Sequence, residues 1–231
     1  MKLGLVVEEK MAPGLAFGLL NVRFSKPPQA FRSWYAARHC IETYRFESVL
    51  DVGAGALEQA AYFAEEGKDV TTIDFGSSIY AQQEVNVSGK SITREYGDAG
   101  VYQFSPAKTF DLVWMSHILE HQHDPGAFLR NYLEQSEGSL FVITLPVMHA
   151  RLWPGHLTLW SPALALYFIA SLGYDMSDAE VIHGANEFSI IFRCVAAINS
   201  PELSYDVGDI HKLRLLLPAW VKENGKSWGK M

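Results

Sequence analysis

Short apolar runs along the chain alternate with segments in which apolar residues recur every three or four positions. The first pattern is typical of buried strands and the second of amphipathic helices. Strands are predicted at residues 48–52, 69–74, 91–96, 109–116, 138–146, 179–183 and 187–195. Helices are predicted at residues 30–44, 57–64, 126–134 and 162–172. Strands that alternate with helices indicate an α/β protein, and the last two strands, which no helix separates, indicate an antiparallel finish.

The first predicted strand ends in the sequence Asp51-Val52-Gly53-Ala54-Gly55. A ligand approaches the backbone closely only where no Cβ intervenes, so a strand, a Gly-x-Gly turn and a helix favour nucleotide binding. Glu58 stands where a dinucleotide fingerprint needs its last small residue, and the Asp51 carboxylate would repel a pyrophosphate. That carboxylate instead suits a ligand with an ammonium group and no phosphate, such as S-adenosylmethionine (SAM).

Residues 49–55 resemble the first motif of class I SAM-dependent methyltransferases, Asp-x-Gly-x-Gly-x-Gly, with Leu57 in place of the third glycine. The strand sequence Phe-Asp-Leu-Val at 110–113, followed by Leu-Glu-His and Asp-Pro, is similar to small-molecule methyltransferases of the methyltransferase-11/23 type. The resemblance covers roughly residues 46–195. It implies SAM as the cofactor and a three-layer α/β sandwich, with a Rossmann-like, doubly wound, mostly parallel seven-stranded sheet and an antiparallel last strand.

The predicted cofactor site follows the carboxyl ends of the first four strands. Asp74, roughly 20 residues after the glycine turn, is at the interval at which an acid reaches a ribose, and Phe75 would lie against the adenine or ribose. Asp98 matches the acid that accepts from the adenine amino group in the resembling family. The structural alternatives are that Asp74 or Ser77 caps a helix containing Ile79 and Tyr80, and that Asp98 belongs to a plain Gly-Asp turn. The full set is Asp51, Gly53, Ala54, Gly55, Asp74, Phe75, Asp98, Ala99, Met115 and Ser116.

Methyl transfer from SAM needs mainly the alignment of donor and acceptor, and a base only if the acceptor must lose a proton. Histidine is the natural base near neutral pH. His117, directly after the fourth strand, and His156, after the fifth, are the predicted catalytic residues. His121 is expected to be structural, through a backbone hydrogen bond, and His123 and His149 to be surface residues. A structural role remains the alternative for each histidine.

The residues His117-x-x-Glu120-His121 also match the inverted zinc-peptidase signature. On a helix the two histidines would share a face and could bind zinc, with Glu120 as the base. The motif begins where a buried strand ends, which is the wrong context for a long helix. The sequence therefore predicts no metal-binding residues.

The composition is that of one globular domain. With 231 residues, 48% of them hydrophobic and 19% charged, the chain can form a single sizeable core. The formal net charge of −7 argues against a nucleic-acid partner. Cys40 and Cys194 have neither metal-binding nor disulfide spacing, which indicates a cytoplasmic location. The apolar run 162–172 is shorter than the about 20 residues that span a bilayer, so no membrane span is expected.

Three segments are expected: an N-terminal arm and lid helix at 1–45, a SAM-binding methyltransferase domain at 46–196 and a C-terminal tail at 197–231. The predicted activity is direct in-line methyl transfer to a small-molecule or glycan acceptor. Trp153, Trp160 and Tyr167 would suit a planar or sugar ring, or belong to the core. A non-catalytic SAM-binding or partner protein, a nicotinamide oxidoreductase and a zinc hydrolase remain alternatives. The acceptor, the methylated atom and the oligomeric state are left open.

Overall fold

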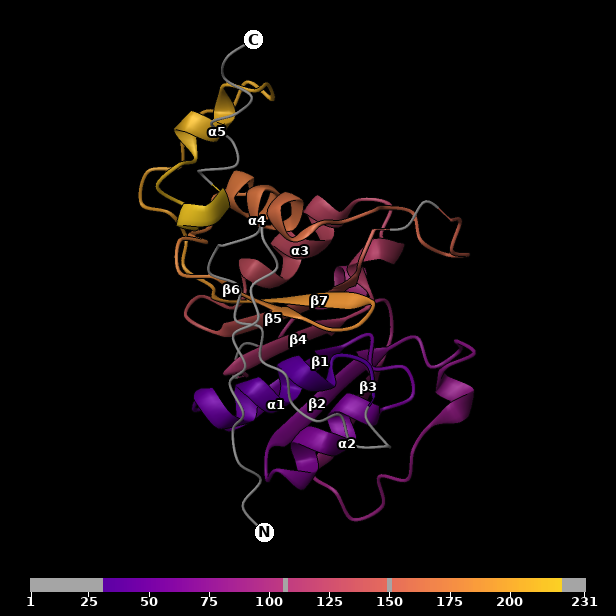
Figure 1. Ribbon diagram of the computed structural model, residues 1–231. Coiled ribbons are helices and arrows are strands. Elements are labelled where there is room, and N and C mark those ends of the chain that lie inside the picture. Colours follow the sequence, from indigo (N-terminus) through magenta and orange to yellow (C-terminus); the bar gives the residue numbers. More distant parts are fainter. Residues whose placement is uncertain (1–30, 106–107, 149–150, 222–231) are drawn as a thin grey trace, which may run out of the picture.

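The computed structural model describes residues 31–105, 108–148 and 151–221. These residues form one seven-stranded sheet in the order β3-β2-β1-β4-β5-β7-β6 (Figure 1). Strand β7 runs antiparallel to both of its neighbours, and the other neighbouring pairs are parallel. The predicted fold class is therefore confirmed. The strands are β1 (Ser48–Val52), β2 (Asp69–Asp74), β3 (Ile92–Tyr96), β4 (Leu112–Ser116), β5 (Leu140–Pro146), β6 (Glu180–His183) and β7 (Glu187–Arg193).

Helices cover both faces of the sheet, which gives the three expected layers (Figure 1). On one face lie α1 (Trp34–Thr43) and α2 (Glu58–Glu65), and on the other lie α3 (Pro125–Leu133), α4 (Pro162–Ser171) and the short α5 (Asp209–Lys212). Helices α3 and α4 begin at side-chain caps, Asp124 and Ser161, and each carries a proline in its first turn. The caps satisfy backbone N–H groups that a helix start leaves unpaired, and proline loses nothing there.

The topology places a ligand site beside β1. The chain runs outward from β1 through β2 to β3, and β4 then pairs with the opposite side of β1. Open α/β sheets bind ligands at the carboxyl ends of the strands where the order reverses in this way. The glycine turn follows β1 and His117 follows β4, so both predicted motifs lie at this point.

Central strand β4 is buried on both faces, as its continuous apolar sequence predicts. Val113 and Met115 face the core beneath α3 and α4, whereas Leu112 and Trp114 face the core beneath α1 and α2. The Trp114 ring packs edge-on against Phe63 of α2, with ring centroids 5.0 Å apart. The two cores hold the strand ends, and with them the site, in a fixed position.

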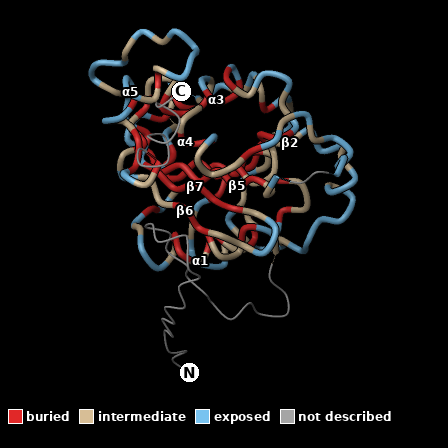
Figure 2. The backbone as a smooth tube through the Cα atoms, turned by 45° about the horizontal axis from the view of Figure 1, so that its top comes forward, coloured by how far each residue is buried: buried red, intermediate tan, exposed pale blue. Residues whose placement is uncertain are grey.

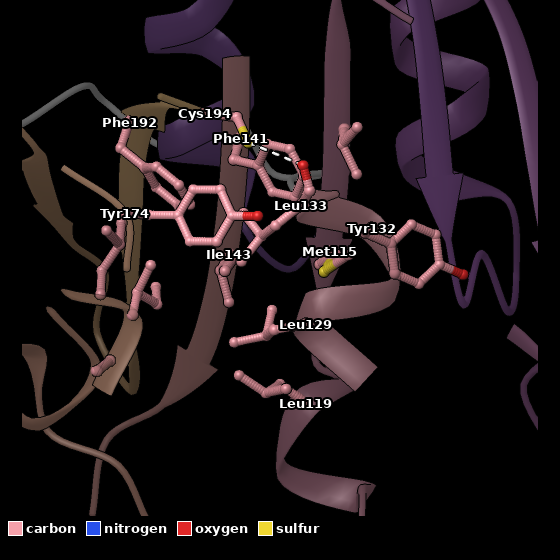
Figure 3. Close-up of a cluster of buried hydrophobic side chains, with 14 of the residues drawn as sticks. Met115, Leu119, Leu129, Tyr132, Leu133, Phe141, Ile143, Tyr174, Phe192 and Cys194 are labelled. Carbon is pink, nitrogen blue, oxygen red and sulfur yellow. Dashed lines mark hydrogen bonds between the residues drawn. The ribbon is translucent and has the colours of Figure 1, made fainter. Parts of the chain in front are cut away.

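Figure 3 shows the first of these cores, where Met115 and Ile143 of the sheet lie beside Leu129 and Leu133 of α3. The Cys194 thiol donates a hydrogen bond to the Leu133 carbonyl at 3.3 Å, so this cysteine is a buried core residue. Figure 2 shows where buried and exposed residues lie in the molecule. Buried residues follow β5, β6 and β7, and exposed residues lie in the loops near α5.

The prediction of a helix containing Ile79 and Tyr80 is wrong. The described chain between β2 and β3 contains only the 3₁₀ turn η1 (Ala81–Gln83). Ile79 and Tyr80 are both exposed, so the segment has no apolar face to bury, and a short helix without one is not stable. Two further 3₁₀ turns are η2 (Ala99–Val101) and η3 (Leu119–His121).

The C-terminal segment packs on the domain as far as it is described. Leu213, Leu217 and Val221 join the core beneath α3 and α4. Most of the expected N-terminal arm lies outside the described residues, and α1 follows directly after it. Within the described ranges, no helix has the length and apolar character needed to cross a membrane.

Candidate functional site

The turn after β1 requires glycine. Gly53 has a φ of 74°, its N–H donates to the Ile73 carbonyl at 2.8 Å, and Gly55 has a φ of 48°. A Cβ on Gly53 would lie 2.5 Å from Cδ1 of Ile118. The left-handed backbone and the close approach both exclude a side chain here, so the chain passes tightly around the end of the strand. Ala54 between the two glycines is buried.

Asp74 ties this turn to the end of β2. One carboxylate oxygen accepts from the Gly55 N–H at 3.0 Å and the other from the Gly76 N–H at 2.7 Å. No helix begins directly after Asp74 in the described chain, so this residue caps none, which removes the structural alternative raised by the sequence. Phe75 beside it is 64% exposed, so its ring is accessible to a ligand.

Leu57 occupies the position of the third glycine in a left-handed conformation, with a φ of 63°. Its N–H donates to the Ala54 carbonyl at 2.8 Å, and its side chain is 2% exposed in the core beneath α1 and α2. The left-handed backbone costs a leucine roughly 1–2 kcal/mol. The turn therefore keeps the shape that glycine would give, with the strain offset by a buried side chain.

Asp51 is buried, and its Oδ2 atom has no hydrogen-bond partner among the described residues. Burial, together with the nearby Asp74 carboxylate, raises the pKa of Asp51 to about 7. A hydrogen bond from the backbone amide of Ala60 has the opposite, smaller effect on this pKa. A cationic group beside this carboxyl would favour its charged form. An ammonium-bearing ligand is therefore chemically compatible with this position.

The remaining predicted cofactor residues play local roles in the structure. Asp98 accepts from the Gly100 N–H at 2.8 Å and caps η2, and the Ala99 carbonyl accepts from the Tyr132 hydroxyl at 2.6 Å. The Met115 side chain lies in the core, so only its backbone could face a ligand. The Ser116 hydroxyl is hydrogen-bonded to that of Ser33. Contacts from these residues to a cofactor stay a prediction.

A cavity of about 440 Å³ opens at this end of the sheet. Ligand pockets commonly have about this size. The structure brings both predicted catalytic histidines, His117 and His156, to its wall although they come from different loops. The lining residues are Phe31, Arg32, Tyr35, Tyr80, His117, His121, Pro146, Trp153, Pro154, His156, Ala185, Asn186 and Glu187.

His117 lies between two carboxylates. Its backbone is left-handed, with a φ of 54°, and its Nδ1 and Nε2 atoms lie 3.1 Å and 2.9 Å from oxygens of Glu120 and Glu187. Burial alone would lower its pKa, but hydrogen bonds and charge from Glu120 and Glu187 raise it to about 9. At neutral pH the ring is therefore protonated and donates from both nitrogens. The expectation that His117 acts as a base is not supported by this environment, which makes it a hydrogen-bond donor.

The sequence alone does not indicate that Glu187 belongs to the site. It opens β7, contacts His117 and accepts from the Ser33 N–H at 2.6 Å, just before α1. Ser33 and His117 are remote from Glu187 in the chain, and an acid at the start of a strand carries no signal of such a contact. The residue joins β4, β7 and the start of α1 around the cavity.

The charge state of His156 differs from that of His117. Burial, together with the nearby His121, His117 and Arg32, lowers the pKa of His156 despite the opposing effect of Glu120. The ring is therefore neutral near pH 7 and keeps a nitrogen lone pair. It faces the His121 ring edge-on, with centroids 5.0 Å apart.

His121 has the predicted structural role. Its Nδ1 atom lies 2.7 Å from the Gly155 carbonyl oxygen, which fastens η3 to the loop that carries His156. His123 is exposed as expected, and His149 lies outside the described residues. Of the aromatic candidates, Trp153 lines the cavity, whereas Trp160 is buried in the core and Tyr167 packs against it.

The inverted zinc-peptidase geometry is absent from the described chain, because His117 follows directly after β4 and residues Leu119–His121 form only a 3₁₀ turn. His117 and His121 therefore share no helix face. A different group comes together instead: ligand atoms of Glu120, His121 and His156 lie within 4.8 Å of one another. This is the group in the described chain that could hold a metal ion.

A family model described as a methyltransferase domain matches residues 21–172. The ubiquinone biosynthesis O-methyltransferase of Rhodopseudomonas palustris strain CGA009 is 30% identical over 140 residues, which are 59% of this chain and 54% of that protein. Its counterpart in strain HaA2 is 27% identical over the same length. The chain thus spans about half the length of the curated relatives it matches.

Solved structures show the same fold at low sequence identity. A Burkholderia thailandensis 1,6-didemethyltoxoflavin-N1-methyltransferase, with bound 1,6-didemethyltoxoflavin and S-adenosylhomocysteine, has a TM-score of 0.55 and 20% identity, covering 71% of this chain and 77% of its own. Human N-acetylserotonin methyltransferase in complex with SAM has a TM-score of 0.54 and 17% identity, covering 70% and 52%. The [4+2]-cyclase SpnF has a TM-score of 0.52 and 19% identity, covering 64% and 58%.

Proposed function

The chain belongs to the family of methyltransferase domains, and from this premise we propose that it transfers a methyl group from SAM to a small-molecule acceptor by direct in-line displacement. The matched residues 21–172 include the glycine turn, Asp74 and both predicted catalytic histidines, His117 and His156. The observation that carries the proposal is the bridge from Asp74 to the glycine turn at the point where the strand order reverses.

We assign the cofactor to the ends of β1 and β2. Each Asp74 oxygen accepts one backbone N–H and keeps a lone pair, so the carboxylate can still bind the two ribose hydroxyls. The exposed Phe75 ring, next to Asp74, would contact the adenine, and the Asp51 carboxyl would face the ammonium end of SAM. The expected contacts from Asp98, Ala99, Met115 and Ser116 belong to the same proposal.

The acceptor binds in the cavity, whose wall includes the rings of Phe31, Tyr35 and Trp153. Aromatic walls favour a planar acceptor, because rings stack face to face or edge to face. The curated relatives are named as O-methyltransferases, which favours a hydroxyl as the methylated group. A glycan acceptor, also expected from the sequence, has no comparable support.

In the displacement, a lone pair of the acceptor oxygen forms a bond to the methyl carbon. The carbon–sulfur bond breaks, its electrons remain on sulfur, and S-adenosylhomocysteine leaves. The hydroxyl must also lose its proton. His156 offers a neutral nitrogen on the cavity wall and is the group at which we place this activation, whereas protonated His117 donates hydrogen bonds and keeps Glu120 and Glu187 in position.

We also propose that α1 closes over the bound cofactor. Tyr35 of α1 lines the cavity. Ser33, which directly precedes α1, is hydrogen-bonded to Glu187 and Ser116. These contacts would hold the start of α1 at the sheet edge as a lid. The expected boundaries of the three segments and the cytoplasmic location stay predictions.

Calorimetric titration with SAM, S-adenosylhomocysteine and NAD tests the cofactor. We expect SAM and its product to bind, and Asp74→Ala to weaken binding by about 10- to 100-fold, the usual value of a charge-assisted hydrogen bond. Asp178→Ala, which removes an exposed acid on a different part of the surface, is the matched control. Failure of the folded protein to bind either compound would refute the proposal, and NAD binding would favour an oxidoreductase.

An acceptor screen with methyl-labelled SAM then tests turnover. Planar compounds that carry a hydroxyl are expected to become labelled. A protein that binds SAM tightly yet labels no member of a broad panel would instead be a non-catalytic SAM-binding protein.

A further inference from the structure

We propose that Glu120, His121 and His156 form a binding site for one divalent transition-metal ion on the wall of the acceptor cavity. The inference rests on the proposed function and refines it, because the open position of the ion would take the acceptor hydroxyl. Ligand atoms of the three residues lie within 4.8 Å of one another. His121 and His156 line the cavity, so an ion held by them would face the acceptor.

The Glu120 carboxylate lacks a partner that its environment requires. The side chain is 0% exposed, and its Oε1 atom contacts Nδ1 of His117 at 3.1 Å. Its Oε2 atom is also buried and has no hydrogen-bond partner among the described residues. A buried polar atom without a partner is costly, and a bound water or ion is one of the ways in which native structures satisfy it. A metal ion would satisfy this oxygen.

His121 has the tautomer that a metal ligand needs. Its Nδ1 atom lies 2.7 Å from the Gly155 carbonyl oxygen, which can only accept, so the ring proton is on Nδ1. Nε2 therefore carries the lone pair, and it lies 4.0 Å from Oε1 of Glu120. A carbonyl that fixes the tautomer of a histidine in this way is a regular feature of metal sites.

The loop that carries His156 is fastened to the turn that carries the other two ligands. The N–H groups of Leu157 and Thr158 donate to the Glu120 carbonyl at 2.8 Å and 3.2 Å, and the His121–Gly155 bond adds a third connection. Ligand atoms around a tetrahedral ion with bonds near 2.1 Å lie about 3.4 Å apart. Small shifts of the His121 and His156 rings, which are partly exposed, would close the remaining gap.

The ligand set favours zinc. Two imidazoles and one carboxylate with an open fourth position form a common catalytic zinc site, whereas Mg²⁺ prefers oxygen ligands and octahedral geometry. The set differs from the sequence signature considered above, because His156 replaces His117. His117 instead contacts the Oε1 atom of Glu120, and this contact positions the carboxylate.

The ion would activate the acceptor as a Lewis acid. The hydroxyl oxygen becomes the fourth ligand, its pKa falls, and its proton passes to a water molecule. The resulting metal-bound oxyanion uses a lone pair to form the bond to the methyl carbon of SAM as the carbon–sulfur bond breaks. With the ion bound, His156 acts as a ligand and not as the proton acceptor.

Metal titration of the chelator-treated full chain tests the site without reference to catalysis. We expect one Zn²⁺ per chain by calorimetry, much weaker Mg²⁺ binding, and the visible absorption of a tetrahedral site with Co²⁺. His121→Ala and His156→Ala should each weaken Zn²⁺ binding at least 10- to 100-fold, the loss seen even for residues that only support a ligand. His123→Ala, an exposed neighbour outside the group, is the matched control. Near-ultraviolet circular dichroism checks that every variant is folded.

The inference is overturned if the folded chain binds no Zn²⁺ or Co²⁺, or if His123→Ala weakens binding as much as the ligand variants do. It is also overturned if methyl transfer keeps its full rate after chelation, a result that leaves the proposed function intact. Conversely, Zn²⁺ binding that depends on His121 and His156 in a protein that does not bind SAM would support the metal site and refute the proposed function.

Discussion

The two ends of the proposed site, the cofactor end at the glycine turn and the acceptor end at the cavity, are assembled in different ways. At the cofactor end, Gly53, Gly55 and Asp74 come from one strand–turn–helix–strand unit, in which the Gly53 N–H donates to the Ile73 carbonyl and the Gly55 N–H donates to the Asp74 carboxylate. At the acceptor end, His117 and Glu187 meet across the sheet from the ends of β4 and β7. The first end depends on the course of the backbone and the second on charges between side chains. Changes at the two ends should therefore affect different properties.

The largest expected effect is the pH dependence that Asp51 imposes on stability. Its pKa is about 7 in the folded protein against an ordinary value of 3.8, so between these values the folded state holds a proton that the unfolded chain has lost. The free energy of unfolding therefore falls as pH rises, by about 3 kcal/mol between pH 5 and pH 8, and levels off above that. Urea unfolding of the wild type and Asp51→Asn at both pH values measures this difference.

Because Asp51→Asn cannot ionise, the fall attributed to this residue should vanish in the variant. Equal pH dependence in the two proteins would show that Asp51 has an ordinary pKa. SAM binding by the wild type should also strengthen as pH rises past 7, since the ammonium group would then meet a charged carboxylate.

A comparison of two glycines isolates the effect of crowding at the cofactor end. Gly53 and Gly67 have similar φ angles, 74° and 80°, but a Cβ on Gly67 meets nothing within 4 Å, whereas one on Gly53 lies 2.5 Å from Ile118. Gly53→Ala should therefore lower the free energy of unfolding by about 2 kcal/mol more than Gly67→Ala. Urea unfolding gives the difference, and equal losses would mean that Ile118 moves aside freely.

Glu187→Gln tests whether the acceptor end can be changed without changing the cofactor end. Removal of one of the two carboxylates that hold the proton on His117 should lower the pKa of that ring from about 9 by about 1–2 units. NMR titration of the His117 ring protons measures the shift. SAM affinity should stay within about twofold, since the contact lies at the acceptor end, and a large loss of SAM affinity would break the proposed separation of the two ends.

The smallest expected effect concerns the strain at Leu57. Both Leu57→Ala and Leu57→Gly lose the buried side chain, but only glycine relieves the left-handed backbone. The glycine variant should therefore be more stable than the alanine variant by about 1 kcal/mol, although both should be less stable than the wild type. Thermal unfolding of the three proteins ranks them, and an alanine variant as stable as the glycine variant would show that the turn relaxes.

The sequence predicted the sheet well because its evidence is local. The unbroken apolar run of β4 reflects burial on both faces, and the lack of a helix before the last strand reflects the antiparallel β6–β7 pair. The prediction of a helix failed around Ile79 and Tyr80, where these apolar side chains remain exposed. Spacing alone does not reveal whether the rest of the protein covers a segment.

The sequence by itself determined the glycine turn, the acid at the end of β2 and the alternation of strands and helices, because each depends on residues close together in the chain. It also marked His117 and His156, although it did not distinguish their charges. Only the tertiary structure decided that two carboxylates hold a proton on His117, that His156 is neutral, and that His156 joins Glu120 and His121 in one cluster. The crossovers bring these side chains together, and their ionisation follows from burial and from neighbours that are remote in sequence.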